Sequence, residues 1–567
     1  MRGGRFKIGR LKHAQAWAAV SDQPENDVVH TPPRIFNAPA CHSAELRIWV
    51  LELSTWVLMD SHNNVSIEAA PFINFSASSL ISTSLVALVG ALLLAKVVQK
   101  MRLKLPPGPF AWPIVGNFLQ LRTGLTPQTL AAVAKKYGDV CLLQMGQRKV
   151  LVISSPAMAK EVLQTQGVEF GSRARNLVFD MTTGHGQDFV FADYGEHWRK
   201  MRRIATVPFF TNKVVQQSRL AWEQEIGQAI SEITAMPEST TSGIIIRDRL
   251  QLMMYNIMYH MMFRRRFSGL DDPLYVQLMK HNRDNHHLAQ SFKYNYGDFV
   301  PSFKPFLRGY LKDVWAANQR RLVFLRDAFL NERRKQTGQK IGVDFFLDAH
   351  LKGEISESSV LYLVQNMNVA AIDTTLWSTE WGVAELVNNP RIQRKIIDEL
   401  DNVLGKGVPL TEPDLPRLPY LQAMVKEILR VHMVVPLLLP HMNLEAAKLA
   451  GYDIPAGCRV LVNAWGIAND PRYWDKLEEF NPDRFLDNNV ELNGNDFRFI
   501  PFGSGRRSCP GSIIALPLLG LVLGKLLQAF EILPPPGDNK VDLSSVGSQL
   551  GLTIAKRSRV VMKPRGM

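Results

Sequence analysis

The most constraining feature of the sequence is a glycine-rich loop with a single cysteine, PFGSGRRSCPGS, at residues 501–512. The frame F-x-x-G-x-R-x-C-x-G is formed by Phe502, Gly505, Arg507, Cys509 and Gly511. Glycines let a backbone approach a flat partner closely. Pro510 suits the first turn of a helix, so we expect Cys509 at a helix N-terminus, where the helix dipole and Arg507 favour the thiolate.

Cysteine usage narrows the role of this loop. The chain has four cysteines, at positions 41, 141, 458 and 509, which are too far apart for a disulfide framework or a paired zinc site. Such sparse usage is typical of a reducing compartment. A thiolate without a partner cysteine suggests a single axial metal ligand. The alternative is that Cys509 is a small buried apolar residue, which five matched positions in ten residues disfavour.

A long uncharged segment precedes the main body. Residues 69–95 carry no charge, basic residues follow at positions 96, 100, 102 and 104, and the nearest upstream Lys or Arg is Arg47. About 20 apolar residues suffice to cross a bilayer as a helix, and the basic flank puts the C-terminal side in the cytosol. We therefore expect a transmembrane anchor at 69–98, with a buried core helix as the alternative. Residues 1–68 form an extension of unknown role.

Beyond the anchor, residues 99–109 form a basic, proline-rich elbow, because proline cannot continue a helix. Residues 110–567 read as one continuous body with many helical patterns and short β-like runs such as 150–153 and 459–462. The formal net charge of +14 does not choose among nucleic acid, membrane and acidic protein partners. No basic stripe with interleaved aromatic residues supports nucleic-acid binding.

Three further patterns carry chemistry. Ala370-Ala-Ile-Asp-Thr-Thr375 combines small residues with an acid and a hydroxyl, Asp373 and Thr374, which suit proton transfer; the alternative is a polar interruption of a core helix. Glu427 and Arg430 share one helix face at i,i+3. So do Trp198 and Arg202 at i,i+4. The neighbouring Arg199, Lys200 and Arg203 form either a solvated face or a docking surface for an acidic protein.

These motifs and their order along the chain resemble the cytochrome P-450 family of haem-thiolate monooxygenases. The resemblance covers nearly everything from Leu105 to the C-terminus. The resemblance implies a fold that is mainly α with small β-sheets, behind a single N-terminal transmembrane helix. It implies haem b, with Cys509 as the iron ligand. The implied haem-binding residues are Trp198, Arg202, Ala370, Ala371, Phe502, Arg507, Cys509 and Gly511.

The resemblance also assigns catalytic and structural residues. It implies that Asp373 and Thr374 are catalytic, and that Glu427, Arg430 and Arg484 of Phe480-Asn-Pro-Asp-Arg-Phe485 form a buried charge triad on the proximal side of the haem pocket. The chain departs from the family at Ala371, where Gly is usual. The loop that carries Cys509 has no departure.

Stretches that haem chemistry does not require resemble one subfamily, the plant trans-cinnamate 4-monooxygenases. They are residues 167–173, 194–203, 208–217, 250–256, 294–298, 368–371 and 440–443. The resemblance implies para-hydroxylation of trans-cinnamate to 4-coumarate, in phenylpropanoid and lignin biosynthesis, at the cytosolic face of the endoplasmic reticulum. Electrons would come from NADPH through cytochrome P-450 reductase. Departures from this subfamily are the extension, Asp373 where Glu is more usual and His432 where Arg is expected.

A cinnamate pocket needs an apolar slot and a group that holds the carboxylate away from the iron. We expect Asn366, Val435 and Lys556 to contact the substrate, although Lys556 next to Arg557 could equally be an ordinary surface lysine. Two other functions stay open from the residues. One is a haem-thiolate enzyme that rearranges hydroperoxides, and the other is a membrane-tethered haem sensor without catalysis.

Overall fold

The computed structural model describes residues 84, 87–88, 90–91, 103–121, 124–290, 296–487, 490–547 and 551–566. Contacts divide the chain into two units, Met1–Leu92 and Leu93–Met567. The described residues of the first unit, 84 to 91 with gaps, are helical. The extension at 1–68 and most of the expected anchor at 69–98 lie outside the described residues. Among the described helices, α20 (Ser512–Ala529) alone is long and apolar enough to span a membrane, but more than half of it is buried in the body.

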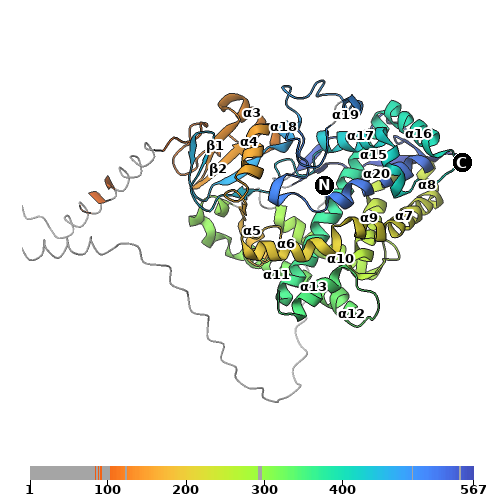
Figure 1. Cartoon of the computed structure of the whole chain (residues 1–567), viewed down its shortest axis with the longest axis horizontal. Helices are drawn as coiled ribbons and strands as arrows, with labels where there is room; N and C mark the ends of the chain where they lie inside the picture. Colours follow the sequence, from red (N-terminus) through yellow and green to blue (C-terminus); the bar gives the residue numbers. More distant parts are fainter. Residues whose placement is uncertain are drawn as a thin grey trace, which may run out of the picture. The chain divides into compact units, whose positions relative to one another are not determined.

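The second unit is mainly helical, as the sequence predicts (Figure 1). Besides α20, its α-helices in the described residues are α3 (Pro127–Tyr137), α4 (Pro156–Lys160), α5 (Leu177–Thr182), α6 (Glu196–Phe209), α7 (Asn212–Ala235), α8 (Pro237–Thr240), α9 (Ile246–Phe263), α10 (Pro273–Gln290), α11 (Arg308–Leu325), α12 (Asn331–Arg334), α13 (Gly342–Leu351), α14 (Glu357–Met367), α15 (Asp373–Asn388), α16 (Pro390–Leu404), α17 (Pro419–Val431), α18 (Ala464–Ala468) and α19 (Arg484–Asp487). A π-helical turn, Asn368–Ile372, joins α14 to α15 without a break.

Small sheets complete the fold. The strands are β1 (Val140–Met145), β2 (Arg148–Ile153), β3 (Ser172–Arg173), β4 (Ile244–Ile245), β5 (His441–Met442), β6 (Ala447–Leu449), β7 (Tyr452–Ile454), β8 (Arg459–Val462), β9 (Phe530–Leu533), β10 (Ser545–Gly547), β11 (Leu552–Ile554) and β12 (Arg559–Pro564). The largest sheet has the order β1-β2-β8-β5-β3. The two β-like runs predicted from the sequence, 150–153 and 459–462, are parallel neighbours in it, with Val150 opposite Arg459.

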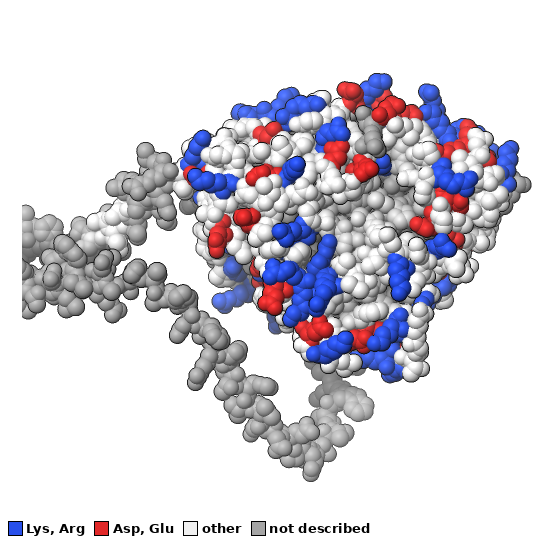
Figure 2. All heavy atoms as spheres, in the orientation of Figure 1, with Lys and Arg blue, Asp and Glu red and all other residues white. Residues whose placement is uncertain are grey.

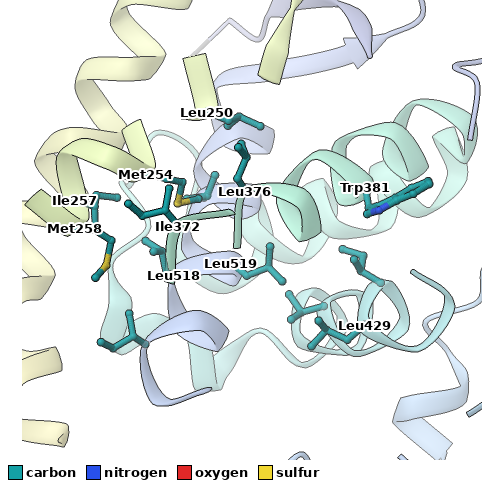
Figure 3. Close-up of a cluster of buried hydrophobic side chains, with 14 of the residues drawn as sticks. Leu250, Met254, Ile257, Met258, Ile372, Leu376, Trp381, Leu429, Leu518 and Leu519 are labelled. Atoms are coloured by element: carbon teal, nitrogen blue, oxygen red, sulfur yellow. The ribbon is translucent and has the colours of Figure 1, made fainter. Parts of the chain in front are cut away.

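The apolar core fixes the position of α15. Figure 3 shows Ile372 and Leu376 in one cluster with Leu518 and Leu519 of α20 and with side chains of α9. All these side chains are buried. Burying a Leu or Ile side chain contributes roughly 1.5–3 kcal/mol. The start of α15, where Asp373 and Thr374 lie, is therefore held rigidly by this packing.

The proline-rich segment after the expected anchor is tied to the body. The backbone N–H of Lys104 donates to the Asp453 carboxylate (2.9 Å), and the N–H of Asp453 donates back to the Lys104 carbonyl (2.8 Å). The N–H of Leu142 on β1 donates to the Pro107 carbonyl (2.9 Å). Residues 104–107 are thus bonded both to the strand pair β6–β7 and to the large sheet.

Candidate active site

The loop around Cys509 is closed by backbone contacts. The N–H of Cys509 donates to the carbonyl of Phe502 (2.9 Å). At Gly505, where φ is +69°, a Cβ atom would lie 2.0 Å from the carbonyl oxygen of Leu163, so no larger residue fits. Helix α20 begins at Ser512, with Gly511 as its N-cap. Cys509 therefore lies just before the helix, not in its first turn, and the N–H groups of Gly511 and Ser512 hydrogen-bond to its sulfur.

The Cys509 side chain is exposed, yet it lies deep in the body. Burial raises the pKa of its thiol, while the two N–H groups and the charge of Arg202 oppose that rise. The prediction that the charge of Arg507 favours the thiolate is wrong, because Arg202 and not Arg507 acts on the sulfur. The Arg507 guanidinium instead donates to the carbonyls of Gly171 (2.7 Å) and Ala192 (2.6 Å). The sulfur is thus accessible, with Arg202 as its nearby positive charge.

The π turn before α15 presents a second exposed surface within otherwise buried helices. Val369 is 49% exposed and Ala370 is also exposed, whereas their neighbours Asn368 and Ile372 are buried. The Thr374 hydroxyl donates to the carbonyl of Ala370 (2.6 Å). Burial raises the pKa of the Asp373 carboxyl to about 6, and the positive charge of Arg321 partly opposes this rise. The acid and the hydroxyl therefore follow directly after a small-residue surface.

Three arginines converge next to the Cys509 loop. Burial and the charges of Arg507 and Arg202 lower the pKa of Arg173 well below its usual range. The pKa of Arg507 falls to about 10, chiefly through burial. Asp188, whose pKa burial raises to about 6, is one carboxylate against these three guanidiniums. A surplus of buried positive charge favours an anionic ligand.

Arg173 and His441 were missed by the sequence reasoning. They are cross-strand partners on β3 and β5. Burial, and next to it the Arg173 charge, lowers the pKa of His441 well below its usual range. Both residues lie in stretches that the sequence marks as subfamily-specific, which was the available signal, but only the strand pairing brings them together.

Helix α6 contacts the Cys509 loop directly. Arg202 donates to the carbonyl of Ser508 (2.7 Å). The Trp198 indole N–H donates to the carbonyl of Phe189 (3.1 Å), and the Arg507 guanidinium lies 4.4 Å from the centre of the Trp198 ring. Trp198, Arg202 and Arg507 are thus brought together beside the loop.

The structure also brings together Glu427, Arg430 and Arg484. Arg430 forms a bidentate ion pair with Glu427 (both contacts 2.8 Å), and Arg484 reaches the same carboxylate (3.1 Å). All three side chains are buried. The backbone N–H of Asn481 and the carbonyls of Asp475 and Ala468 satisfy further polar atoms of the triad. The network joins α17 to the segment that precedes the Cys509 loop.

The three expected substrate residues have different surroundings. Asn366 donates to Asp188 (2.9 Å), and its amide oxygen is buried without a hydrogen-bond partner among the described residues. Val435 is half-buried, and the preceding carbonyl, of Val434, accepts from Leu552 on β11 (2.9 Å). Lys556 is exposed just beyond β11, where its charge acts on Asp542. The C-terminal hairpin therefore lies next to Val435, while Asn366 belongs to the charged cluster around Asp188.

His432, the departure from the expected Arg, is accommodated by two contacts. Its ring stacks on Trp381 (3.9 Å between centroids, 7° between planes), and its Nε2 lies 2.6 Å from the Glu385 carboxylate. The position thus keeps a polar partner for Glu385.

These residues fit a haem. One accessible sulfur with N–H donors suits a single iron ligand, and no cluster of three or more His, Cys, Asp or Glu in the described part of the chain offers a competing metal site. The converging guanidiniums of Arg173, Arg202 and Arg507 suit two propionates. The small side chains of Ala370 and Ala371 leave room above a flat ring. Iron coordination would deprotonate the thiol.

The fold and this site define a haem-thiolate protein, and the comparisons with known proteins agree. The cytochrome P450 family model matches residues 106–558, and the chain belongs to this family. Its cofactor is therefore haem. A solved structure described as "Zebra fish cytochrome P450 another structure with Abiraterone" superposes with a TM-score of 0.65 at 26% identity, covering 78% of this chain and 100% of that one.

Plant proteins of one kind are much more similar. The trans-cinnamate 4-monooxygenase of Catharanthus roseus is 57% identical over 499 residues, and that of Arabidopsis thaliana is 58% identical over 499 residues. In both comparisons the alignment covers 86% of this chain and 99% of the relative. The similarity thus extends far beyond the haem motif.

Proposed function

We propose that this chain is a membrane-associated monooxygenase that inserts one oxygen atom at the para carbon of trans-cinnamate to give 4-coumarate. The observation that carries the proposal is 57–58% identity with trans-cinnamate 4-monooxygenases over 99% of their length. When bound, haem supplies dioxygen activation with electrons that originate from NADPH. The protein must orient the ring, exclude water and supply protons.

Proton supply is assigned to Asp373 and Thr374. The Asp373 carboxyl, with its pKa raised to about 6 by burial, can hold or release a proton near neutral pH. The Thr374 hydroxyl bonds the Ala370 carbonyl and can pass a proton on from that position. An enzyme that rearranges hydroperoxides, or a sensor, has no use for this pair, and neither alternative is favoured by the relatives.

Substrate orientation requires that the carboxylate be held away from the iron. We assign the apolar surface to half-buried Val435, next to the C-terminal hairpin that bonds Val434. We assign the carboxylate to Lys556 or Asn366, acting directly or through water. Asn366 retains one amide hydrogen beyond the one it donates to Asp188, so it can serve both groups. Holding a reactant in a fixed orientation can lower the barrier by several kcal/mol.

A basic face supports docking of a flavoprotein reductase. Figure 2 shows Lys and Arg side chains gathered over α6. Arg199 and Arg506, the latter from the Cys509 loop, are exposed and both lie 5.8 Å from the Tyr194 ring. Arg203 is paired with Glu354 (3.0 Å). Exposed charges like those of Arg199 and Arg506, which form no ion pair among the described residues, suit an acidic electron donor.

An apolar surface patch supports membrane association in the endoplasmic reticulum. It consists of exposed side chains from two segments, Phe110, Trp112, Ile114, Leu119, Tyr296, Phe303 and Phe306. Phe118 links the segments through ring contacts to Tyr296 (6.0 Å) and Phe299 (5.3 Å). Contiguous exposed apolar surface of this kind marks a membrane or protein contact.

The test is product analysis of the full chain with haem, NADPH, a plant reductase and trans-cinnamate. We expect 4-coumarate, with NADPH and oxygen consumed in equal amounts. Lys556→Met or Asn366→Ala should raise KM for cinnamate with little change in the haem spectrum, and Arg557→Met serves as the exposed neighbouring control. Turnover of a hydroperoxide without NADPH, or tight cinnamate binding without oxygen uptake, would replace the proposal by one of the alternatives.

A further inference from the structure

A second buried polar cluster lies behind Asp373, where α9, α10 and α11 meet. Arg321 and Asn318 of α11 are 4% and 0% exposed. Nε and Nη2 of Arg321 and both amide atoms of Asn318 have no hydrogen-bond partner among the described residues. Asn282 of α10 donates to the Tyr255 hydroxyl (2.8 Å), but its own Oδ1 is buried and equally without a partner in the described ranges.

Such a cluster is costly unless something satisfies it. A guanidinium stays protonated in proteins, and an unsatisfied buried charge costs several kcal/mol. Buried polar groups are nearly always bonded, often by ordered water when protein partners are missing. The orphan atoms include donors on Arg321, an acceptor on Asn282 and one of each on Asn318. Water both donates and accepts, so it matches this mixture better than an anion does.

A surface pocket lies against the helix segment that carries the cluster. A pocket of about 280 Å³ lies between α10 and α11 and is lined by Asp284, Leu288, Asp313, Ala316, Ala317 and Arg320. Ala317 and Arg320 are the chain neighbours of Asn318 and Arg321. Asn285 links α10 to α11, because its Nδ2 donates to the carbonyls of His281 on α10 (2.9 Å) and Ala317 on α11 (3.4 Å). Three charged side chains, of Asp284, Asp313 and Arg320, line the pocket, so water should enter it readily.

The cluster also reaches the π turn. Burial lowers the pKa of Arg321, and the neighbouring Tyr255, Tyr259 and Asp373 oppose this change, which places all three within electrostatic reach of its guanidinium. The Tyr259 hydroxyl donates to Asn368 in the π turn (2.7 Å). Asp373 therefore interacts electrostatically with Arg321, while Tyr259 bonds the π turn that precedes it.

We propose that Arg321, Asn318 and Asn282 hold a chain of water molecules that connects the α10–α11 pocket with Asp373. Along this chain one proton enters from solvent for each proton that the Asp373 carboxyl gives up toward Thr374. Arg321 is a positioning residue, because it orients water and Asp373 and is not itself deprotonated. The proposal rests on the monooxygenase function above and adds the route by which its protons arrive.

The direct test is a high-resolution crystal structure of the haem-loaded full chain. We expect ordered waters bonded to Arg321, Asn318 and Asn282, in line toward Asp373. A dry cluster, or one in which these side chains pair only with each other, would overturn the proposal. This result does not depend on which substrate the enzyme takes. A failed cinnamate assay would therefore contradict the proposed function but not the proposed chain of water molecules.

The kinetic test uses Asn318→Leu and Arg321→Met, with the exposed Lys312→Met on the same helix as the control. Product formation should fall about 10-fold, less than the roughly 100-fold or more that loss of a positioned acid or base costs. The solvent deuterium isotope effect should rise, because proton entry becomes slower. The reduced carbonyl spectrum and the cinnamate-induced spectral change should stay as in the wild type.

Two variants guard against misfolding. Removing the Asn318 amide leaves an apolar side chain of similar size in a buried position, so Asn318→Leu should keep the fold even if Arg321→Met does not. Arg321→Lys keeps a cation and donors, and it should recover part of the rate. Unchanged turnover and isotope effect in a folded Asn318→Leu protein would contradict the proposal.

Discussion

Cys509 is both accessible and poorly solvated, a combination that a surface cysteine lacks. Burial favours its thiol, and the Gly511 and Ser512 N–H groups with Arg202 favour its thiolate. A metal ion that binds there displaces the proton, so iron binding and deprotonation are coupled. The affinity of the site for iron should therefore depend on the two N–H groups as well as on sulfur.

Cys509→Ser should abolish the red-shifted band of the reduced carbonyl complex. Serine keeps the size of the side chain but is a poor donor to haem iron, so the spectrum loses the thiolate signature. The measurement is the difference spectrum of purified protein. Cys458→Ser is the matched control, because Cys458 is a buried free cysteine directly before β8. It should leave the band in place. Survival of the band in Cys509→Ser would move the ligand elsewhere.

Asp373 should reduce stability at neutral pH. Its folded-state pKa of about 6 lies above the unfolded value of about 3.9, so the folded state binds more protons between these values and stability falls as the pH rises through that window. Asp373→Asn should therefore stabilise the fold by up to about 3 kcal/mol above pH 6 and by nothing below about pH 4. Urea unfolding of both proteins at pH 4 and pH 7 measures this difference. An equal change at both pH values would exclude titration of Asp373 as the cause.

At the scale of the elements, α17 carries a fully buried ion pair. Glu427 is surrounded by Arg430, Arg484 and the N–H of Asn481, and all its contacts lie out of water. The carboxylate thereby ties α17 to α19, which begins at Arg484. Such a network is costly to break on one side, because the remaining charges stay buried.

Glu427→Gln should destabilise the protein by about 3–5 kcal/mol, since it leaves two buried guanidiniums without a counter-charge. Glu332→Gln is the matched control, because Glu332 forms an i,i+3 pair with Lys335 (2.7 Å) at the surface. Exposed pairs contribute about 0–1 kcal/mol. Denaturant unfolding of both variants tests the contrast, and equal losses would show that burial of the triad does not matter.

Much at the element scale could be predicted from the sequence, and the exceptions share a cause. The mainly helical body, the strands at 150–153 and 459–462 and the shared face of Glu427 and Arg430 follow from local patterns. The π turn, the Arg173–His441 pair and the cluster around Arg321 do not. Each depends on contacts with residues that lie far away in the chain. The local periodicity of the sequence does not indicate which of these distant residues a buried Arg will contact.

At the scale of the whole molecule, the apolar surface patch belongs to the second unit, which begins at Leu93. The patch lies in segments 110–119 and 296–306, within the second unit. Residues 104–107 are bonded to the body by the Asp453 and Leu142 contacts, so the fold of the second unit includes them. Removing residues upstream of Leu103 should leave these bonds intact.

A chain that starts at Leu103 should keep its haem spectrum and bind membranes more weakly than the full chain. Its residual binding should disappear in Trp112→Asp with Phe306→Asp, because these side chains are 50% and 83% exposed in the patch. Flotation with phospholipid vesicles measures binding. Leu351→Asp, at an 82% exposed position outside the patch, is the control. Loss of haem binding in the shortened chain would contradict an independent body.

The π turn at 368–372 makes the length of the continuous helix from α14 to α15 as important as its composition. A π turn holds one residue more than an α turn. Deleting a residue there would restore a regular α-helix and rotate everything upstream by about 100° relative to α15. Asn366 would then leave Asp188, although no side chain had been replaced. Substitutions in this segment that keep its length should therefore preserve the contact between Asn366 and Asp188, whereas an insertion or a deletion there should break it.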